Sequence, residues 1–379
     1  MTEKIIIPKK VTTMNVRQIS ILFLSLLILT LTLASCSKNI ETADIKSDYL
    51  SCSPRDGMTP YCGFTNPEDM VIIADGTKLL VSEMGVFMQD TPGSLSLLDL
   101  ASGQKQPIKM IWAREGEFWG DNLCPQPQIS LFSPHGIDLM TRTDGKEQLL
   151  VVNHGGREAV EFFELSQLNN EWQLQWKGCA VPPDDPFIND VAGLNDGGFV
   201  VTHMWDKNQA YFMLVLKYLV GINTGWVWEW QPQTGFQKLA GSSGSAPNGI
   251  VVSEDNSKIY VNLYGNNKTI KLDRLTGLLE GEFKIQQPDN ITLDADDNLW
   301  IASHKHNPLT QDCTKVVEGP CLLPFEIVKA DAKSMQTEVI LSHQGAPTGY
   351  STVALKVGNN IYMGSAHSDR IVSFGLQFE

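Results

Sequence analysis

A short pattern repeats along this 379-residue chain and restricts its fold more than any other feature. Each copy begins with a polar doublet or near-doublet, continues as a strand, turns at Asp, Asn or Gly, and returns as an apolar strand, as in QPDNITLDADDNLWIASH at 287–304. Alternation bounded by turn residues indicates two antiparallel strands joined by a hairpin. The copies lie at 67–84, 133–156, 188–204, 247–262, 287–304 and 351–367. All-strand repeats at intervals of roughly 40–70 residues predict an all-β fold, a six-bladed β-propeller that closes as one domain.

The polar doublets suggest what lies at the centre of such a ring. They are Glu68-Asp69, His135-Gly136, Asn189-Asp190, Asn248-Gly249, Asp289-Asn290 and Ser351-Thr352. A propeller would bring them together near its axis, and calcium takes 6–8 oxygen ligands in flexible geometry. The alternative is that Asp and Asn serve only as turn residues at strand entries. Because four of the doublets are acidic or amide and stand in register, we expect a central calcium site.

The N-terminus has the organisation of a bacterial lipoprotein signal. Basic residues precede an apolar run at 19–33, which ends in Leu33-Ala34-Ser35-Cys36. This run is shorter than the about 20 apolar residues that span a bilayer. We therefore expect a signal peptide at 1–35, lipidation of Cys36, a tether at 36–60 and the propeller at 61–379. An uncleaved signal anchor and a start at Met14 remain alternatives.

These features predict an exported protein that is lipid-anchored to a bacterial membrane. Ser37 follows the cysteine, which in a Gram-negative cell favours the outer membrane, with the domain at the cell surface or in the periplasm. Removing residues 1–35 removes one Glu and four basic residues, so the formal charge moves from -14 to -17. An acidic domain of this kind does not indicate a nucleic-acid partner.

Cysteine usage fits an oxidising compartment, because six of the seven cysteines remain if Cys36 is lipidated. Six cysteines allow 15 pairings, so the sequence alone does not fix them. Pairs that close short loops are our prediction, namely Cys52–Cys62 and Cys313–Cys321, with Cys124–Cys179 left as the third. No CxxC spacing is present to indicate a zinc or thioredoxin-type site.

The second repeat carries the candidates for acid–base chemistry. His135 opens its first strand and His154 closes its second strand, so one hairpin places both imidazoles at the same end. One histidine could take a proton from water while the other orients or relays it. The alternative is two hydrogen-bonded structural histidines beside a polar channel. The serine-hydrolase motif GxSxG is absent, and GSSGS at 241–245 lacks its spacing.

Ordered motifs give the chain a more specific resemblance. SPHGI followed by LLVVNH is similar to the paraoxonase/arylesterase family of calcium-dependent lactonases, which lies within the gluconolactonase-like clan of six-bladed propellers. So are PEDMVI, FINDV, APNGIVVSEDNSKIYV, DNITLDADDNLWIASH and GYSTVAL, and the resemblance runs from Phe64 to the C-terminus. It implies two calcium ions, one catalytic and one structural, and a His135–His154 dyad with His135 as base. His304 matches a histidine that lines the family's pocket.

The resemblance also assigns ligands. The catalytic calcium would be held by Glu68, Asn189, Asn248, Asp289 and Asn290. The structural calcium would be held by Asp69, Asp190 and the backbone carbonyl of Ile137. Family members have a membrane-associated helix over the active site, which residues 210–230 resemble; an ordinary buried strand or helix is the alternative for this stretch.

Departures from the family leave the substrate open. The anchor is a lipobox, glycines at 155 and 156 follow His154 where proline is common, the family's terminal disulfide is absent, and 311–324 carries an extra disulfide loop. We expect a calcium-dependent hydrolase of lactones and aryl esters, a carboxylic-ester hydrolase with a small-molecule substrate. The alternatives are a gluconolactonase-type sugar-lactone hydrolase and a non-catalytic surface propeller that binds a ligand or partner.

Overall fold

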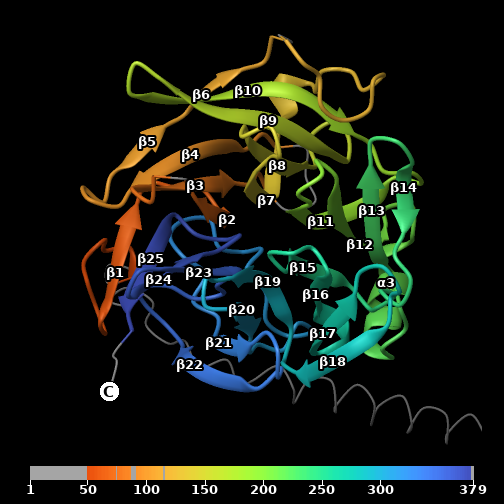
Figure 1. Ribbon diagram of the computed structural model, residues 1–379. Coiled ribbons are helices and arrows are strands. Elements are labelled where there is room, and N and C mark those ends of the chain that lie inside the picture. The colour runs from red at the N-terminus through yellow and green to blue at the C-terminus, as the bar shows by residue number, and fades with distance from the viewer. Residues whose placement is uncertain (1–48, 74, 87–90, 114–115, 377–379) are drawn as a thin grey trace, which may run out of the picture. The chain divides into compact units, whose positions relative to one another are not determined.

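The computed structural model describes residues 49–73, 75–86, 91–113 and 116–376, and these form six sheets around a central axis (Figure 1). The first three blades contain β2 (Pro67–Ile72), β3 (Lys78–Glu83), β4 (Ser94–Asp99) and β5 (Lys105–Pro107); β7 (Pro134–Thr141), β8 (Glu147–Asn153), β9 (Ala159–Leu168), β10 (Glu171–Ala180) and β6 (Lys109–Ile111); and β11 (Pro186–Gly193), β12 (Phe199–Asp206), β13 (Trp226–Gln231) and β14 (Gly235–Lys238). The last three contain β15 (Pro247–Val252), β16 (Lys258–Leu263), β17 (Lys268–Asp273) and β18 (Leu279–Lys284); β19 (Pro288–Leu293), β20 (Asn298–His304), β21 (Phe325–Asp331) and β22 (Thr337–His343); and β23 (Val353–Val357), β24 (Asn360–Gly364), β25 (Arg370–Gly375) and β1 (Met58–Cys62). The predicted six-bladed propeller is confirmed.

The innermost strand of each blade touches the innermost strand of the next. Contacts run from β2 to β7, β11, β15, β19 and β23 and return to β2, so the ring is closed. Each predicted repeat forms the inner hairpin of one blade, from β2–β3 to β23–β24. The strand entries that carry the polar doublets therefore converge near the centre, as Figure 1 shows for the inner strands.

The hairpin turns explain why Asp, Asn and Gly recur at fixed places. Every inner hairpin turns through a residue with a positive φ, which glycine adopts freely and Asn or Asp tolerates best among the others. These residues are Gly76, Gly145, Gly197, Asn256, Asp297 and Gly358. Turn chemistry thus sets the register of each hairpin, and with it the end at which the doublet lies.

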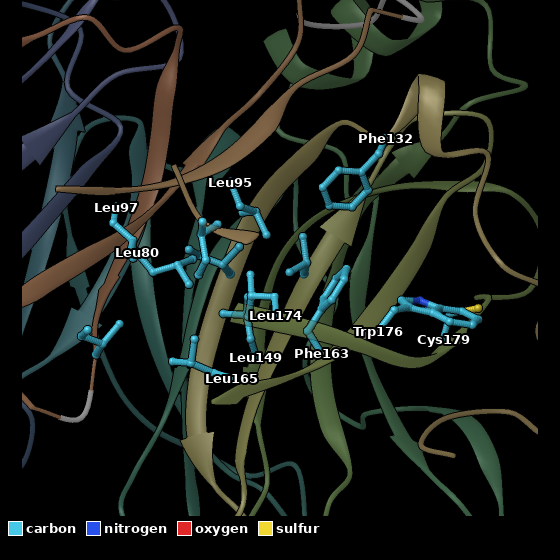
Figure 2. Close-up of a cluster of buried hydrophobic side chains, with 14 of the residues drawn as sticks. Leu80, Leu95, Leu97, Phe132, Leu149, Phe163, Leu165, Leu174, Trp176 and Cys179 are labelled. Carbon is cyan, nitrogen blue, oxygen red and sulfur yellow. The ribbon is translucent and has the colours of Figure 1, made fainter. Parts of the chain in front are cut away.

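Hydrophobic cores lie between neighbouring blades and fix their order. The cluster in Figure 2 joins Leu80 and Leu97 of the first blade to Leu149, Phe163 and Leu174 of the second. Corresponding hydrophobic clusters join each later pair of neighbouring blades, and one cluster joins the sixth blade to the first. Because the middle strands are covered on both faces, β8 and β20 are almost continuously buried. Each fully buried Leu or Phe contributes about 1.5–3 kcal/mol.

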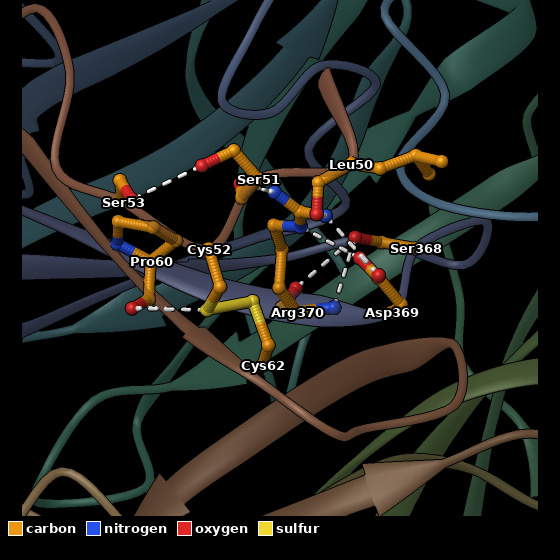
Figure 3. Close-up of a disulfide and its surroundings, with 9 residues drawn as sticks. All are labelled: Leu50, Ser51, Cys52, Ser53, Pro60, Cys62, Ser368, Asp369 and Arg370. Carbon is orange, nitrogen blue, oxygen red and sulfur yellow. Dashed lines mark hydrogen bonds and ion pairs between the residues drawn. A yellow bond between two sulfur atoms is a disulfide. The ribbon is translucent and has the colours of Figure 1, made fainter. Parts of the chain in front are cut away.

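The ring closes by pairing the two ends of the described chain. β1 runs antiparallel to β25, with Met58 opposite Phe374 and Cys62 opposite Arg370, as expected for a ring that joins its terminal segments. The sheet begins at Met58, slightly before the expected domain start at Tyr61. The buried Arg370 guanidinium donates hydrogen bonds to Ser51 O at 2.7 Å and to Asp369 at 2.6 and 3.1 Å (Figure 3). Part of the expected tether therefore packs on the sixth blade.

All three predicted disulfides are present, and each ties down a loop outside the sheets. Cys52–Cys62 joins the segment before β1 to the end of that strand (Figure 3). Cys124–Cys179 attaches the long connection between β6 and β7 to β10. Cys313–Cys321 closes a short loop between β20 and β21.

The stretch at 210–230 divides into two elements rather than forming one cover. Its first part is the helix α3 (Tyr211–Leu219), on which Phe212 and Leu216 are exposed, and its last part enters β13. Short 3-10 turns, η1 (Ile129–Leu131) and η2 (Tyr264–Asn266), complete the elements. Within the described residues no helix has the length and apolarity to cross a membrane. The predicted signal peptide and Cys36 lie outside the described residues.

Candidate active site

Irregular backbone at the central strand ends changes the direction of the side chains at five of the six doublets. The antiparallel register shifts at the doublet in the inner strands of five blades, at 67–69, 134–137, 188–191, 247–250 and 288–291. A bulge of this kind breaks the strict alternation of side chains and redirects them. The glycine positions are used for close approach, because a Cβ on Gly136 would lie 2.6 Å from Asp190 Oδ1.

Four side-chain oxygens at this centre are buried and have no hydrogen-bond donor. They are Glu68 Oε2, Asn189 Oδ1, Asn248 Oδ1 and Asn290 Oδ1. A buried oxygen without a donor costs about 1–3 kcal/mol, so a group of them calls for a common partner. All four belong to the predicted catalytic calcium set, whose fifth member Asp289 is also buried. This donor set, all oxygen and mostly amide, fits a hard cation such as calcium.

Two contacts hold the set in place. Asn290 Nδ2 donates to Glu68 Oε1 at 2.9 Å. The other oxygen of each side chain, Asn290 Oδ1 or Glu68 Oε2, has no hydrogen-bond partner. Asn262 Nδ2 donates to the backbone carbonyl of Asp289 at 2.5 Å, which fixes that doublet. Among the described residues, no group of three or more His, Cys, Asp or Glu side chains is arranged as a metal site. The predicted calcium set is not such a group, because three of its five members are asparagines.

Carboxylates crowd the same region. Burial, followed by the charge of Glu68, raises the pKa of Asp289 and of Asp69 well above the ordinary value. Burial and the charge of Asp69 do the same to the pKa of Asp190. Burial lowers the pKa of His135, but Glu68, Asp289 and Asp69 outweigh it, so the net shift is upward. A buried excess of negative charge contributes to all of these pKa shifts, and a divalent cation would neutralise it.

Two of the residues predicted to hold a structural calcium, Asp69 and Asp190, also accept backbone hydrogen bonds between blades. Asp69 Oδ2 accepts the Ile137 N–H at 2.8 Å, and Asp190 Oδ2 accepts the Ile250 N–H at 2.8 Å. Each carboxylate thereby links its inner strand to that of the next blade. The carbonyl of Ile137 as a ligand, and the second ion itself, stay predictions.

The predicted histidine pair is in hydrogen-bond contact. His135 Nδ1 lies 2.6 Å from His154 Nε2, and His135 Nε2 lies 3.4 Å from Glu68 Oε1. The pair therefore adjoins the oxygen set directly. Burial is the first cause that lowers the pKa of His154, so this imidazole is neutral near pH 7.

Glu158 and Lys207 were missed by sequence reasoning. Glu158 Oε2 accepts from His154 Nδ1 at 2.8 Å, and Lys207 Nζ donates to Glu158 Oε1 at 2.9 Å. The sequence did not indicate that His154 and Glu158 are in contact, because both lie in the irregular connection between β8 and β9, where no strand periodicity applies.

His304 lies on another side of the site, beside Asp289. Its Nε2 is 3.3 Å from Asp289 Oδ2 and donates to the carbonyl of Ser351 at 3.0 Å, so its Nδ1 accepts the Tyr264 hydroxyl at 3.1 Å. Burial is the main cause that lowers the pKa of His304 to about 3, so it stays neutral. The His304 ring stacks on Tyr350 with centroids 3.9 Å apart. We infer that His304 is held rigidly as part of a wall.

Further polar rings extend this wall. His306 and His367 contact Tyr350 with centroids 5.3 and 5.9 Å apart, and the buried His306 Nδ1 has no hydrogen-bond partner. Tyr264 could have been found from the sequence, since it follows β16 as His154 follows β8. The α3 residue Tyr218 reaches the wall, because its ring centroid lies 6.4 Å from that of Tyr264. Its hydroxyl accepts from Gln287 Nε2 at 3.3 Å.

A family model of arylesterases matches residues 65–371. The chain belongs to the arylesterase family. Membership confirms the resemblance and places the protein among hydrolases that act on esters or lactones. No curated protein matches the sequence.

Solved structures with a similar shape share little sequence. A gluconolactonase from Xanthomonas campestris is 12% identical, with 84% of this chain and 89% of that chain covered and a TM-score of 0.49. A luciferin-regenerating enzyme is 12% identical over 84% and 96% of the two chains, with a TM-score of 0.49. The calcium-binding regucalcin from Agrobacterium tumefaciens is 15% identical over 84% and 93%, with a TM-score of 0.46.

Proposed function

We propose that this protein is a calcium-dependent hydrolase of lactones and aryl esters. The observation that carries the proposal is the group of buried, unpartnered oxygens of Glu68, Asn189, Asn248 and Asn290 beside the His135–His154 pair. A scaffold that used a cation only for stability would not require two linked imidazoles next to it. The calcium when bound would polarise the substrate carbonyl and stabilise the oxyanion that forms on it.

The residues of the chain account for the proton movements. His135 would accept a proton from the attacking water as a new bond forms between water oxygen and carbonyl carbon. The same proton would go to the departing alkoxide or phenoxide when the original ester C–O bond breaks. His154 holds His135 through the 2.6 Å contact and shares the positive charge. His304, neutral and fixed between Ser351 and Tyr264, would orient the substrate rather than transfer protons.

A gluconolactonase-type activity is a second candidate, favoured by the wall of Tyr264, His304, His306 and Tyr350. Phenol hydroxyls and the unpartnered His306 Nδ1 offer hydrogen bonds that suit a hydroxylated lactone better than an alkyl chain. The two candidates differ in substrate but use the same oxygen set and histidine pair.

A panel of long-chain lactones, aryl esters and aldonolactones, hydrolysed with and without calcium chelation, tests the proposal. We expect turnover that is lost on chelation and restored by calcium, with the preferred substrate deciding between the two candidates. The His135→Gln variant should bind calcium and hydrolyse the same substrates far more slowly. No turnover of any panel member by a protein with calcium bound would overturn the hydrolase proposal and leave a binding module.

We also propose that the chain is exported and anchored by lipid at Cys36. The basic, apolar and Cys-terminated order of residues 1–36 supports this. Radiolabelled fatty acid should be incorporated into the protein, and the Cys36→Ala variant is the control. Equal labelling of wild type and variant, or no labelling of either, would refute the proposed lipid anchor at Cys36.

A further inference from the structure

An unbroken series of polar contacts leads from the oxygen set to the protein surface. It passes from Glu68 through His135, His154 and Glu158 to Lys207, with separations of 3.4, 2.6, 2.8 and 2.9 Å. The Glu158 side chain is 1% exposed, whereas the Lys207 side chain is 38% exposed. The outer end of the series is therefore a buried carboxylate held by a lysine that reaches solvent.

Glu158 can only accept hydrogen bonds in this environment. Burial raises the pKa of Glu158, but His154 and Lys207 outweigh it and the net shift is downward, so the carboxylate is ionised. Its Oε2 also accepts the Ile188 N–H at 3.3 Å. Since the carboxylate has no proton to give, the hydrogen in its contact with His154 must reside on His154 Nδ1.

This assignment fixes the hydrogen between the two imidazoles. With a hydrogen on Nδ1, neutral His154 presents a lone pair at Nε2, so the 2.6 Å contact requires a hydrogen on His135 Nδ1. Neutral His135 then has its lone pair at Nε2, the atom that faces Glu68 and the oxygen set. The reverse tautomers would place a hydrogen there and block the base.

Aromatic packing holds the plane of the outer imidazole. The Phe187 ring stacks on His154 with centroids 4.4 Å apart and an interplanar angle of 17°. Trp205 stacks on Phe187 in turn, at 4.7 Å and 10°. The His154 ring is thus restricted in tilt, and Glu158 determines which of its nitrogens carries the hydrogen.

We propose that Glu158, held by Lys207, is a positioning residue that fixes the tautomers of both histidines so that His135 Nε2 is the proton acceptor. The inference rests on the proposed hydrolase function and adds a residue that the family resemblance did not assign. During attack, one water proton goes to His135 Nε2 while its Nδ1 proton shifts toward His154 Nε2. The reverse shift returns a proton to the leaving oxygen, so no proton is lost, and the Glu158 charge stabilises the transient positive charge on the pair.

The Glu158→Gln variant tests this, because glutamine has nearly the same shape but can donate to His154 Nδ1 and reverse the hydrogen-bond direction. Glu164→Gln is the matched control, since Glu164 lies on β9 and pairs with a lysine, Lys177 at 3.1 Å. The full chain, purified in mild detergent, is labelled with 15N-histidine for NMR. Calcium affinity, kcat and KM are measured on the same samples.

We expect Glu158→Gln to lower kcat on the order of 100-fold, as for loss of a positioned general base, with KM and calcium affinity unchanged. The 15N shifts of His154 should change from the Nδ1–H to the Nε2–H tautomer, and Glu164→Gln should match wild type. An unchanged His154 tautomer in Glu158→Gln, or a kcat equal to that of the control, would overturn the positioning role. A loss of calcium affinity together with kcat would also overturn it, because Glu158 would then act through the structure of the oxygen set.

The two proposals fail in different ways. If wild type hydrolyses no substrate, the hydrolase function fails, whereas the NMR shifts still decide the tautomer assignment. If Glu158→Gln does not fold, Lys207→Met keeps the carboxylate but removes its clamp. That variant should lower kcat less than Glu158→Gln was expected to, at unchanged calcium affinity, and an unaltered kcat would count against the proposal.

Discussion

Replacing Asp289 by asparagine should have opposite effects on stability with and without calcium. The Asp289 carboxyl is buried beside Glu68, and both circumstances raise its pKa above the ordinary value. A folded-state pKa above the unfolded one means that the folded protein binds more protons, so cation-free stability falls as pH rises through this interval. Each pKa unit of that rise disfavours the ionised folded state by about 1.4 kcal/mol. The neutral amide of the Asp289→Asn variant removes this cost.

The size of the effect can be measured as a melting temperature. A change of 1 kcal/mol moves Tm by roughly 2–4 °C in domains of 150–250 residues, and by somewhat less in longer ones. In chelator at pH 8, Asp289→Asn should therefore melt at least a few degrees above wild type. With calcium at 100 times its Kd, wild type should gain about 2.7 kcal/mol, which corresponds to at most roughly 5–10 °C, whereas the variant, having lost a charged ligand, should gain little.

Differential scanning fluorimetry of both proteins in chelator and in calcium gives the four melting temperatures. Asp255→Asn is the control, because this exposed carboxylate lies in a hairpin turn and its effect should be the same in both buffers. The reasoning predicts that the order of wild type and Asp289→Asn reverses when calcium is added. An order that is the same in both buffers would refute it.

Other predictions concern the ion, the ring closure and the disulfide loop. Calcium affinity measured by titration calorimetry should fall as pH is lowered from 8 to 5.5, because carboxyls with raised pKa values must lose protons to bind; a pH-independent affinity would contradict this. Arg370→Leu should destabilise the protein by about 1–3 kcal/mol in urea unfolding, since it removes the hydrogen-bond donor of the Ser51 carbonyl and the partner of Asp369. An unchanged midpoint would show that β1–β25 pairing closes the ring without these contacts. Cys313→Ser with Cys321→Ser should cost about 2–3 kcal/mol and raise KM without altering calcium affinity, because the loop adjoins His367; a reduced calcium affinity would show coupling to the oxygen set.

The repeated hairpins predicted most of the fold because one local pattern appears in every blade. Alternation and turn residues specify a strand pair without long-range information, so each inner hairpin lies where the sequence placed it. The closure between β1 and β25 followed from the general need of a ring to join its ends. A helix within 210–230 was expected only from the family resemblance, because the apolar run itself fits a buried strand as well as an exposed helix; the structure has α3 in its first part and β13 at its end.

The candidate site was predicted where its residues occupy equivalent positions in the repeats. Glu68, Asn189 and Asn248 could be grouped because each stands at a strand entry, and in the structure an oxygen of each is buried without a hydrogen-bond partner. Glu158 and Lys207 could not be grouped this way, because they come from connections that differ between blades. Their contact depends on how the second and third blades pack, and no local sequence pattern predicts this packing.

A chelator titration that follows bound calcium and hydrolysis rate on the same sample tests the central claim most directly. The account predicts that the rate falls in proportion to the calcium lost from the oxygen set of Glu68, Asn189, Asn248 and Asn290, and that it returns when calcium is restored. It also predicts that His135→Gln holds the same calcium while turning over slowly. A rate that persists after all calcium has been removed, or that is absent while calcium is fully bound, would contradict the account.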